Sequence, residues 1–195
     1  MQFLKDFSIT SITSVIITLI ALFNNIIITR QIGPEGRGIY SVISNLVVLF
    51  GLIFGEGLRR SNTILIGKIK SDLNKLVNDT LVFTFILSII FVIIYFNNFL
   101  WREILPNISN KYFALTLIIS VFSIIWMSYQ ALLLGLQKIL TFNIVQIIST
   151  ATFFVITFVG IYVFDFNTFH IVIGLAVSSL ITAIVCLFIF IKKYE

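Results

Sequence analysis

The stretch SITSITSVIITLIALFNNIIIT, residues 8–29, decides the class of protein to which this chain belongs. It carries no formal charge, and as an α-helix it is long enough to cross a bilayer core about 30 Å thick. It is longer than the apolar region of a cleavable signal peptide, and no small-residue cleavage site follows it. We therefore expect a retained membrane-spanning helix.

The composition of the whole chain agrees with this interpretation. The 195 residues are 59% apolar and 11% charged, whereas a soluble domain is about 45–50% apolar and about 25% charged. Soluble enzymes, secreted disulfide scaffolds, nucleic-acid-binding modules and disordered chains are excluded on this ground. The single cysteine, Cys186, lies in an apolar run, so the chain cannot form an internal disulfide.

Six apolar runs predict an all-α membrane protein, a single six-transmembrane-helix lobe over residues 1–195. Each run is continuous and lacks the alternation typical of a membrane β-barrel. The limits are about Ser8–Thr29, Gly38–Leu58 or longer, Leu81–Phe96, Tyr112–Gly135, Asn143–Phe164 and His170–Ile191. Asp165 is expected in the short turn between the last two helices.

The segment from Ile64 to Asp79 has a different pattern. Leu65, Ile69 and Leu73 recur at helical spacing, while charged residues fill the other positions. This pattern predicts an amphipathic helix on the anionic cytoplasmic leaflet, with a solvated linker as the alternative.

Lysine and arginine predict the orientation, because they are more frequent in cytoplasmic loops. Nine of them fall on the side of the N-terminus and four on the other side. We therefore expect both termini in the cytoplasm and a multi-pass protein of the cell membrane.

Polar residues follow one face of the first helix, at Ser11, Ser14, Thr18 and Asn25. Such side chains face either other helices or a wet cavity, because hydrocarbon offers them no hydrogen-bond partner. For the carboxamides of Asn25 and Asn45, in the first two helices, both interpretations remain open. For the GxxxG motif at residues 51–55, helix packing is the favoured interpretation.

The residues at the two ends of the second helix carry the charges of interest. Arg30, Glu35 and Arg37 lie in the glycine-rich segment 29–38, which predicts a tight, shaped turn. Glu56 precedes Arg59 and Arg60 by three and four residues, so ion pairs are possible on a helix that continues past Leu58. Arginine suits phosphate binding, although a pair that reaches for lipid headgroups is the alternative interpretation.

The sequence has no motif for catalysis. We find no G-x-S-x-G, H-E-x-x-H, C-x-x-C or P-loop pattern, and the single His170 starts a helix without a neighbouring ligand residue. We therefore expect no enzyme activity, no metal and no cofactor.

Two segments resemble a known family. Residues 32–40, IGPEGRGIY, are similar to the turn between the first two helices of Wzx-type polysaccharide flippases, which belong to the MATE/MOP exporter superfamily. Residues 130–138, QALLLGLQK, are similar to the segment that joins their fourth and fifth helices.

The resemblance implies that the chain corresponds to the N-terminal half of a transporter with two six-helix lobes. The implied substrate is a lipid-linked diphosphate oligosaccharide, flipped across the membrane for O-antigen or lipopolysaccharide synthesis. The implied partners are membrane lipids and a second lobe or a second copy of the chain. The predicted substrate-binding residues are Arg59, Arg60, Arg30, Arg37, Asn25, Asn45 and Gln130.

Other functions remain open at the level of sequence. A multidrug or cation exporter would use acidic residues in the cavity, for which Glu56 is the candidate. A membrane-embedded enzyme lacks support, and a truncated scaffold that transports nothing is a further alternative.

Overall fold

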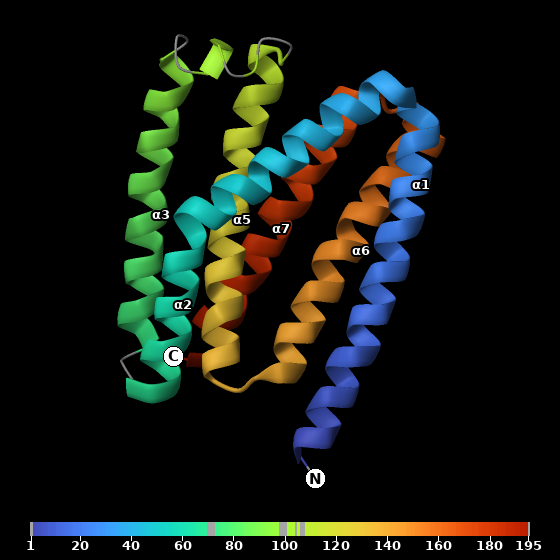
Figure 1. Cartoon of the computed structure of the whole chain (residues 1–195). Helices are drawn as coiled ribbons and strands as arrows, with labels where there is room; N and C mark the ends of the chain where they lie inside the picture. The colour runs from blue at the N-terminus through green and yellow to red at the C-terminus, as the bar shows by residue number, and fades with distance from the viewer. Residues whose placement is uncertain (1, 70–72, 98–100, 104, 106–107, 195) are drawn as a thin grey trace.

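The computed structural model describes residues 2–69, 73–97, 101–103, 105 and 108–194, which form a bundle of long helices (Figure 1). The elements are α1 (Gln2–Phe50), the π-helix η1 (Gly51–Gly55), α2 (Glu56–Ile64), the π-helix η2 (Leu65–Ile69), α3 (Leu73–Phe96), α5 (Asn110–Gly135), α6 (Ile139–Phe164) and α7 (Thr168–Tyr194). Within these ranges no strand occurs, which confirms the predicted all-α class.

A single residue, Gly33, bends α1 into two arms. Its φ of 67° and ψ of −175° interrupt an otherwise helical backbone, and a glycine tolerates this positive φ without the steric cost of a side chain. Pro34 follows at the start of the second arm, where the missing N–H is not needed. The predicted shaped turn is therefore confirmed, and it is shorter than the predicted loop of residues 29–38.

The bend allows one helical stretch to supply two membrane crossings. The stretch Asp6–Gly67 contains 62 residues, so it would measure about 93 Å if it were straight, about three times the thickness of a bilayer core. Folded at Gly33, it provides two rods, and α3, α5, α6 and α7 are each long and apolar enough to add one. The described residues thus form an all-α membrane bundle.

The second rod continues past Leu58, as the sequence predicts. It passes through η1, α2 and η2 as far as Ile69 without leaving a helical conformation. Gly51 and Gly55 face α5, where an added Cβ would lie 3.6 Å from the sulfur of Met127 and 3.3 Å from Ile124. This close approach confirms the packing interpretation of the GxxxG motif.

The predicted amphipathic helix at Ile64–Asp79 is not a separate element. Residues 65–69 end the second rod, residues 70–72 lie outside the described residues, and the remainder forms the first turns of α3. Ile66 and Leu76 are buried in one core cluster with Tyr129 of α5, and the half-buried Leu65 and Leu73 pack against the same cluster. Ile64, by contrast, is 49% exposed. The described leucines of the stripe thus contact the bundle, and the position of the segment on the cytoplasmic leaflet stays a prediction.

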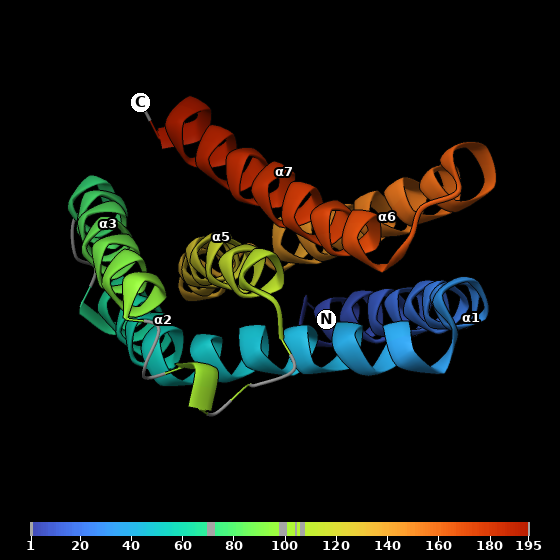
Figure 2. The same cartoon turned by 90° about the horizontal axis from the view of Figure 1, so that it is seen from above.

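Helix α5 occupies the centre of the bundle. Figure 2 shows it between α3, α1 and α7, and it contacts each of α1, α2, α3, α6 and α7. Its buried residues Thr116, Ser120 and Ser128 each donate a hydrogen bond to a carbonyl one turn earlier on the same helix. These bonds allow hydroxyls to remain inside the apolar core.

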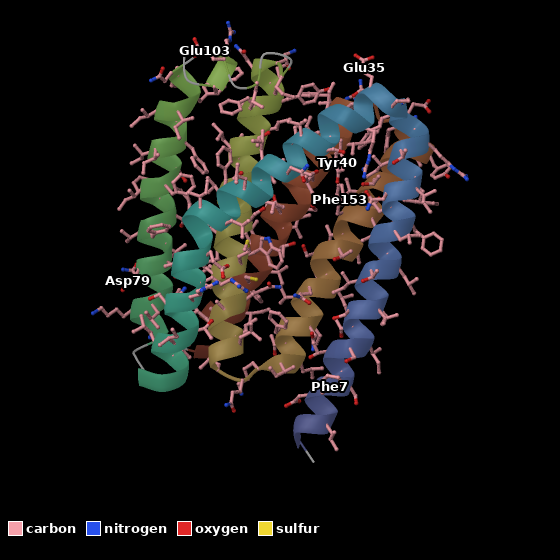
Figure 3. All side chains as sticks on the ribbon, viewed as in Figure 1. Phe7, Glu35, Tyr40, Asp79, Glu103 and Phe153 are labelled. Atoms are coloured by element: carbon pink, nitrogen blue, oxygen red, sulfur yellow. The ribbon has the colours of Figure 1, made fainter. Side chains whose placement is uncertain are left out.

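The charged and polar turns lie at the ends of the rods. Figure 3 shows Glu35 and Glu103 at one end of the bundle and Phe7 at the opposite end. Asp165 adopts a left-handed conformation, with a φ of 49°, at the C-terminus of α6. This position confirms the predicted turn between the last two helices.

The bend packs against the start of α7, and this contact generates a prediction. A Cβ on Gly36 would lie 2.5 Å from Thr168 Oγ1 and 2.8 Å from Ile32 Cβ, whereas a Cβ on Gly38 would have nothing within 4 Å. We expect Gly36→Ala to lower the free energy of unfolding by about 1–3 kcal/mol. Gly38→Ala is the matched control and should cause no loss, because alanine is the better helix former.

Heating the purified protein with a thiol-reactive dye measures this difference, because Cys186 is fully buried and reacts only when the bundle opens. Equal melting temperatures for the two variants would contradict the described packing of the bend.

Candidate functional site

A groove lies against the bend, on the side of the first arm of α1. Both arms contribute to it, and its volume is about 700 Å³. We call it the arginine groove. Its lining residues are Thr18, Ala21, Leu22, Asn25, Ile26, Thr29, Arg30 and Arg37.

Arg37 is held in place from two sides. Its guanidinium donates a hydrogen bond of 3.0 Å to Asn25 Oδ1, across the bend, and its Cζ lies 5.4 Å from the centre of the Tyr40 ring. Among the described residues, no carboxylate forms an ion pair with Arg37 or with Arg30. The groove therefore carries two positive charges that remain available to an anion.

A second cavity lies deeper in the bundle and is lined mainly by hydroxyl groups. It has a volume of about 340 Å³, and we call it the hydroxyl pocket. Its polar residues are Asn24, Asn25, Ser44, Ser123, Ser149, Thr150, Ser178 and Ser179, and its aromatic residues are Tyr40, Trp126 and Phe153. Figure 3 shows Tyr40 and Phe153 in the interior of the bundle.

The two cavities adjoin each other along the first arm of α1. Ala21 and Asn25 line both of them, so Asn25 lies between the cationic end and the hydroxyl-lined interior. The arrangement can bind a ligand with an anionic part and a hydrogen-bonding part. It contains no adjacent nucleophile and base of the kind that chemical catalysis requires.

A second group of charges lies on α2. Glu56 accepts hydrogen bonds of 2.8 and 2.9 Å from Arg59 and one of 2.9 Å from Arg60, so one carboxylate binds both guanidinium groups. The predicted ion pairs are thus present. Because Glu56 neutralises one of the two positive charges, this cluster attracts an anion less strongly than two free arginines would.

The structure brings together three of the seven residues that the sequence predicts to bind substrate. Asn25, Arg30 and Arg37 line the arginine groove. Arg59 and Arg60 form the separate cluster on α2. The binding roles of all seven remain predictions.

The other two predicted residues lie elsewhere. Asn45 is exposed on the second arm of α1 and lines neither cavity. Gln130 is buried in α5, and its Nε2 has no hydrogen-bond partner among the described residues. Gln130 lies on a buried stretch of α5, residues 128–133, which packs against neighbouring helices.

The sequence analysis missed the hydroxyl pocket, although its signals were present. Asn24 precedes Asn25 and lies about 100° away from it around the helix, which turns it toward the bundle interior. Ser178 of the last helix stands four residues after Gly174 and four before Thr182, so these three small or polar residues share one face. A stripe on one helix does not reveal which neighbouring helix it faces, so the convergence of these residues requires the tertiary structure.

Metal chemistry finds no support in the part of the chain that the structure describes. No group of three or more His, Cys, Asp or Glu side chains lies together there. The exposed His170 stacks against Phe166, with ring centres 5.2 Å apart.

Comparison with known proteins gives one match. A family model described as "Polysaccharide biosynthesis protein" matches residues 3–195. No curated protein and no solved structure matches the chain.

The charge cluster on α2 generates a testable prediction. Glu56→Gln should lower the melting temperature, because it leaves two guanidinium groups on one helical turn without a counter-charge. Arg59→Gln in the same chain should recover part of the loss, since a single positive charge then remains. A double-mutant cycle measures the energetic coupling between Glu56 and Arg59. The melting temperature of each variant is determined from the thiol reactivity of Cys186 on heating. If the losses in melting temperature of the two single variants simply add in the double variant, the pairing of Glu56 with Arg59 is contradicted.

Proposed function

Because the chain belongs to the polysaccharide biosynthesis protein family, we propose that it helps to move a lipid-linked oligosaccharide across the cell membrane. The family establishes a role in polysaccharide biosynthesis, and the bundle is that of a multi-pass membrane protein. The observation that carries the finer proposal is the arginine groove. It provides two arginines that form no ion pair within the part of the chain that the structure describes, beside a polar pocket.

The chemistry of the substrate explains why such a groove is needed. A lipid-linked saccharide carries an anionic diphosphate, which is costly to expose to hydrocarbon. Arg30 and Arg37 supply positive charge and donors with a geometry that suits phosphate oxygens. Asn25 holds Arg37 toward the groove through its hydrogen bond across the bend. No chemical step is assigned to the chain.

The exposed face of α1 supports a partner for this lobe. Ser11, Ser14, Thr18 and Asn25 are exposed along one face of the first arm. Ser14 and Thr18 donate to carbonyls one turn earlier, at 2.9 and 2.8 Å, and Asn25 accepts a hydrogen bond from Arg37. A continuous row of polar groups is still costly to expose to lipid, so water or another protein surface is the more favourable cover. We infer that a second six-helix lobe, or a second copy of this chain, lies opposite this face and encloses the passage. The same proposal places both termini on the cytoplasmic side.

The structure favours this proposal over a cation exporter. An exporter of cations would present an acidic side chain to its cargo, and Glu56 is the acid that the sequence offers for this role. Its carboxylate oxygens already accept bonds from two arginines. A truncated scaffold differs from the proposal in that it would not bind a lipid diphosphate.

Binding of farnesyl diphosphate, a short polyprenyl diphosphate, tests the proposal on the purified chain in detergent. We expect Arg30→Ala with Arg37→Ala to weaken binding by about tenfold or more, because each arginine contributes charge-assisted hydrogen bonds worth about 1.5–3 kcal/mol. Arg59→Ala with Arg60→Ala should weaken binding less, since Glu56 already occupies those donors.

Farnesol, which lacks the diphosphate, is the matched control ligand and should bind all variants equally. The proposal fails if farnesyl diphosphate binds the Arg30/Arg37 double variant as tightly as it binds the unaltered chain. It also fails if the unaltered chain does not distinguish farnesyl diphosphate from farnesol.

A further inference from the structure

We propose that the hydroxyl pocket binds the sugar that is attached directly to the diphosphate, by accepting hydrogen bonds from the hydroxyl groups of that sugar. The proposal rests on the proposed function, because it takes the diphosphate to lie in the adjoining arginine groove. It assigns a role to Asn24 and to several hydroxyl groups that the anion site does not use.

Asn24 provides the first argument. Its side chain lines the pocket, it is only 5% exposed, and its Oδ1 has no hydrogen-bond donor among the described residues. A buried amide oxygen without a donor costs free energy, and most buried polar atoms in proteins have a partner. A ligand that donates a hydrogen bond into the pocket removes this cost.

The hydroxyl groups of the pocket extend the argument. Ser178 and Ser179 donate their protons to the backbone oxygens of Leu175 and Ala176, at 2.9 and 2.8 Å. Ser44 and Thr150 likewise bond carbonyls one turn earlier on their own helices, at 2.9 and 3.1 Å. With the proton directed to the backbone, each hydroxyl oxygen presents lone pairs to any ligand. The pocket therefore selects a ligand rich in hydrogen-bond donors.

The size of the pocket and the positive charges beside it favour a sugar ring over a bare cation. A volume of about 340 Å³ equals that of about eleven water molecules, which is room for one ring with some water. Tyr40, Trp126 and Phe153 offer ring faces, which are partly negative, to the C–H groups of a sugar. Arg30 and Arg37 in the neighbouring groove repel a cation.

The position of the pocket fits a sugar joined to an anion. Ala21 and Asn25 line both cavities, so a ligand can occupy the two together. Asn24 and Arg30 stand on the same helical arm, about 9 Å apart along its axis. A sugar and the diphosphate attached to it can bridge this separation.

The fluorescence of Trp126 tests the proposal on the full chain. The chain has two tryptophans, and Trp101 stacks on Phe113, so Trp101→Phe leaves Trp126 as the reporter of the pocket. The probes are α-D-glucose 1-phosphate and inorganic phosphate. We expect glucose 1-phosphate to change the emission of Trp126 at about tenfold lower concentration than phosphate does, because the sugar adds hydrogen bonds.

Variants of the pocket should remove this preference without removing phosphate binding. Asn24→Leu and Ser178→Ala, made separately, should each reduce the difference in affinity between glucose 1-phosphate and inorganic phosphate. Asn143→Leu is the matched control, because Asn143 is also buried with an unpartnered Oδ1 but lies outside the pocket, and it should retain the preference. The thiol reactivity of Cys186 on heating shows whether each variant is folded. Of the two pocket variants, Ser178→Ala changes the side-chain volume least.

The outcomes separate this inference from the proposed function. If phosphate binds through Arg30 and Arg37 but glucose 1-phosphate gains nothing, the sugar site is overturned and the anion site stands. If sodium chloride alone changes the emission of Trp126 and Asn24→Leu abolishes that change, the pocket is a cation site and the inference is overturned. If neither probe binds the unaltered chain, both proposals fail.

Discussion

The constraint that organises this molecule is the absence of water in the hydrocarbon core, where every polar side chain needs a partner. The chain meets it in three ways. Most serines and threonines donate to the backbone one turn earlier, as Thr84 does to Thr80. A few amides and hydroxyls pair between helices, as Asn62 does with Thr80 at 3.0 Å. Asn24, Asn25 and a group of serines and threonines gather around two adjoining cavities, which is why those cavities can be interpreted as a site. Outside the cavities, buried atoms such as Gln130 Nε2 and Asn143 Oδ1 have no partner among the described residues.

The bend at Gly33 brings the charged and polar residues of the candidate site together. Because one non-helical residue reverses the chain, Arg30 and Arg37 arrive at the same groove from opposite arms. Asn25 then bonds Arg37 across the bend and also borders the hydroxyl pocket. Positive charge and hydrogen-bonding groups thus lie next to each other without any long loop to position them. On α2, by contrast, Glu56 neutralises part of the charge that Arg59 and Arg60 supply.

Much of the fold could be predicted from the sequence, because a membrane helix is a local feature that its own residues largely determine. Apolar runs, and the glycine and proline residues that interrupt them, predict the rods and the bend at Gly33. They also predict the helix that continues beyond Leu58. The segment Ile64–Asp79 was predicted as one helix, whereas it is divided between the end of the second rod and the start of α3. Amphipathic spacing does not reveal this division, because it is the same whether leucines face a membrane surface or another helix. Within the site, the charges around the bend were found by their closeness in sequence. The pocket around Asn24 was missed because side chains from both arms of α1 and from α5, α6 and α7 create it.

Exposure of Asn25 to water tests the central claim most directly, that a hydrated polar groove runs along the first arm of α1. In a Cys186→Ala background, a cysteine at position 25 can be compared with one at position 93, where Ile93 is 62% exposed on the apolar face of α3. Both chains are incubated in membranes with a water-soluble, negatively charged thiosulfonate reagent. The account predicts rapid modification at position 25 and very slow modification at position 93, since only the first faces water. Equally slow modification at both positions would contradict it.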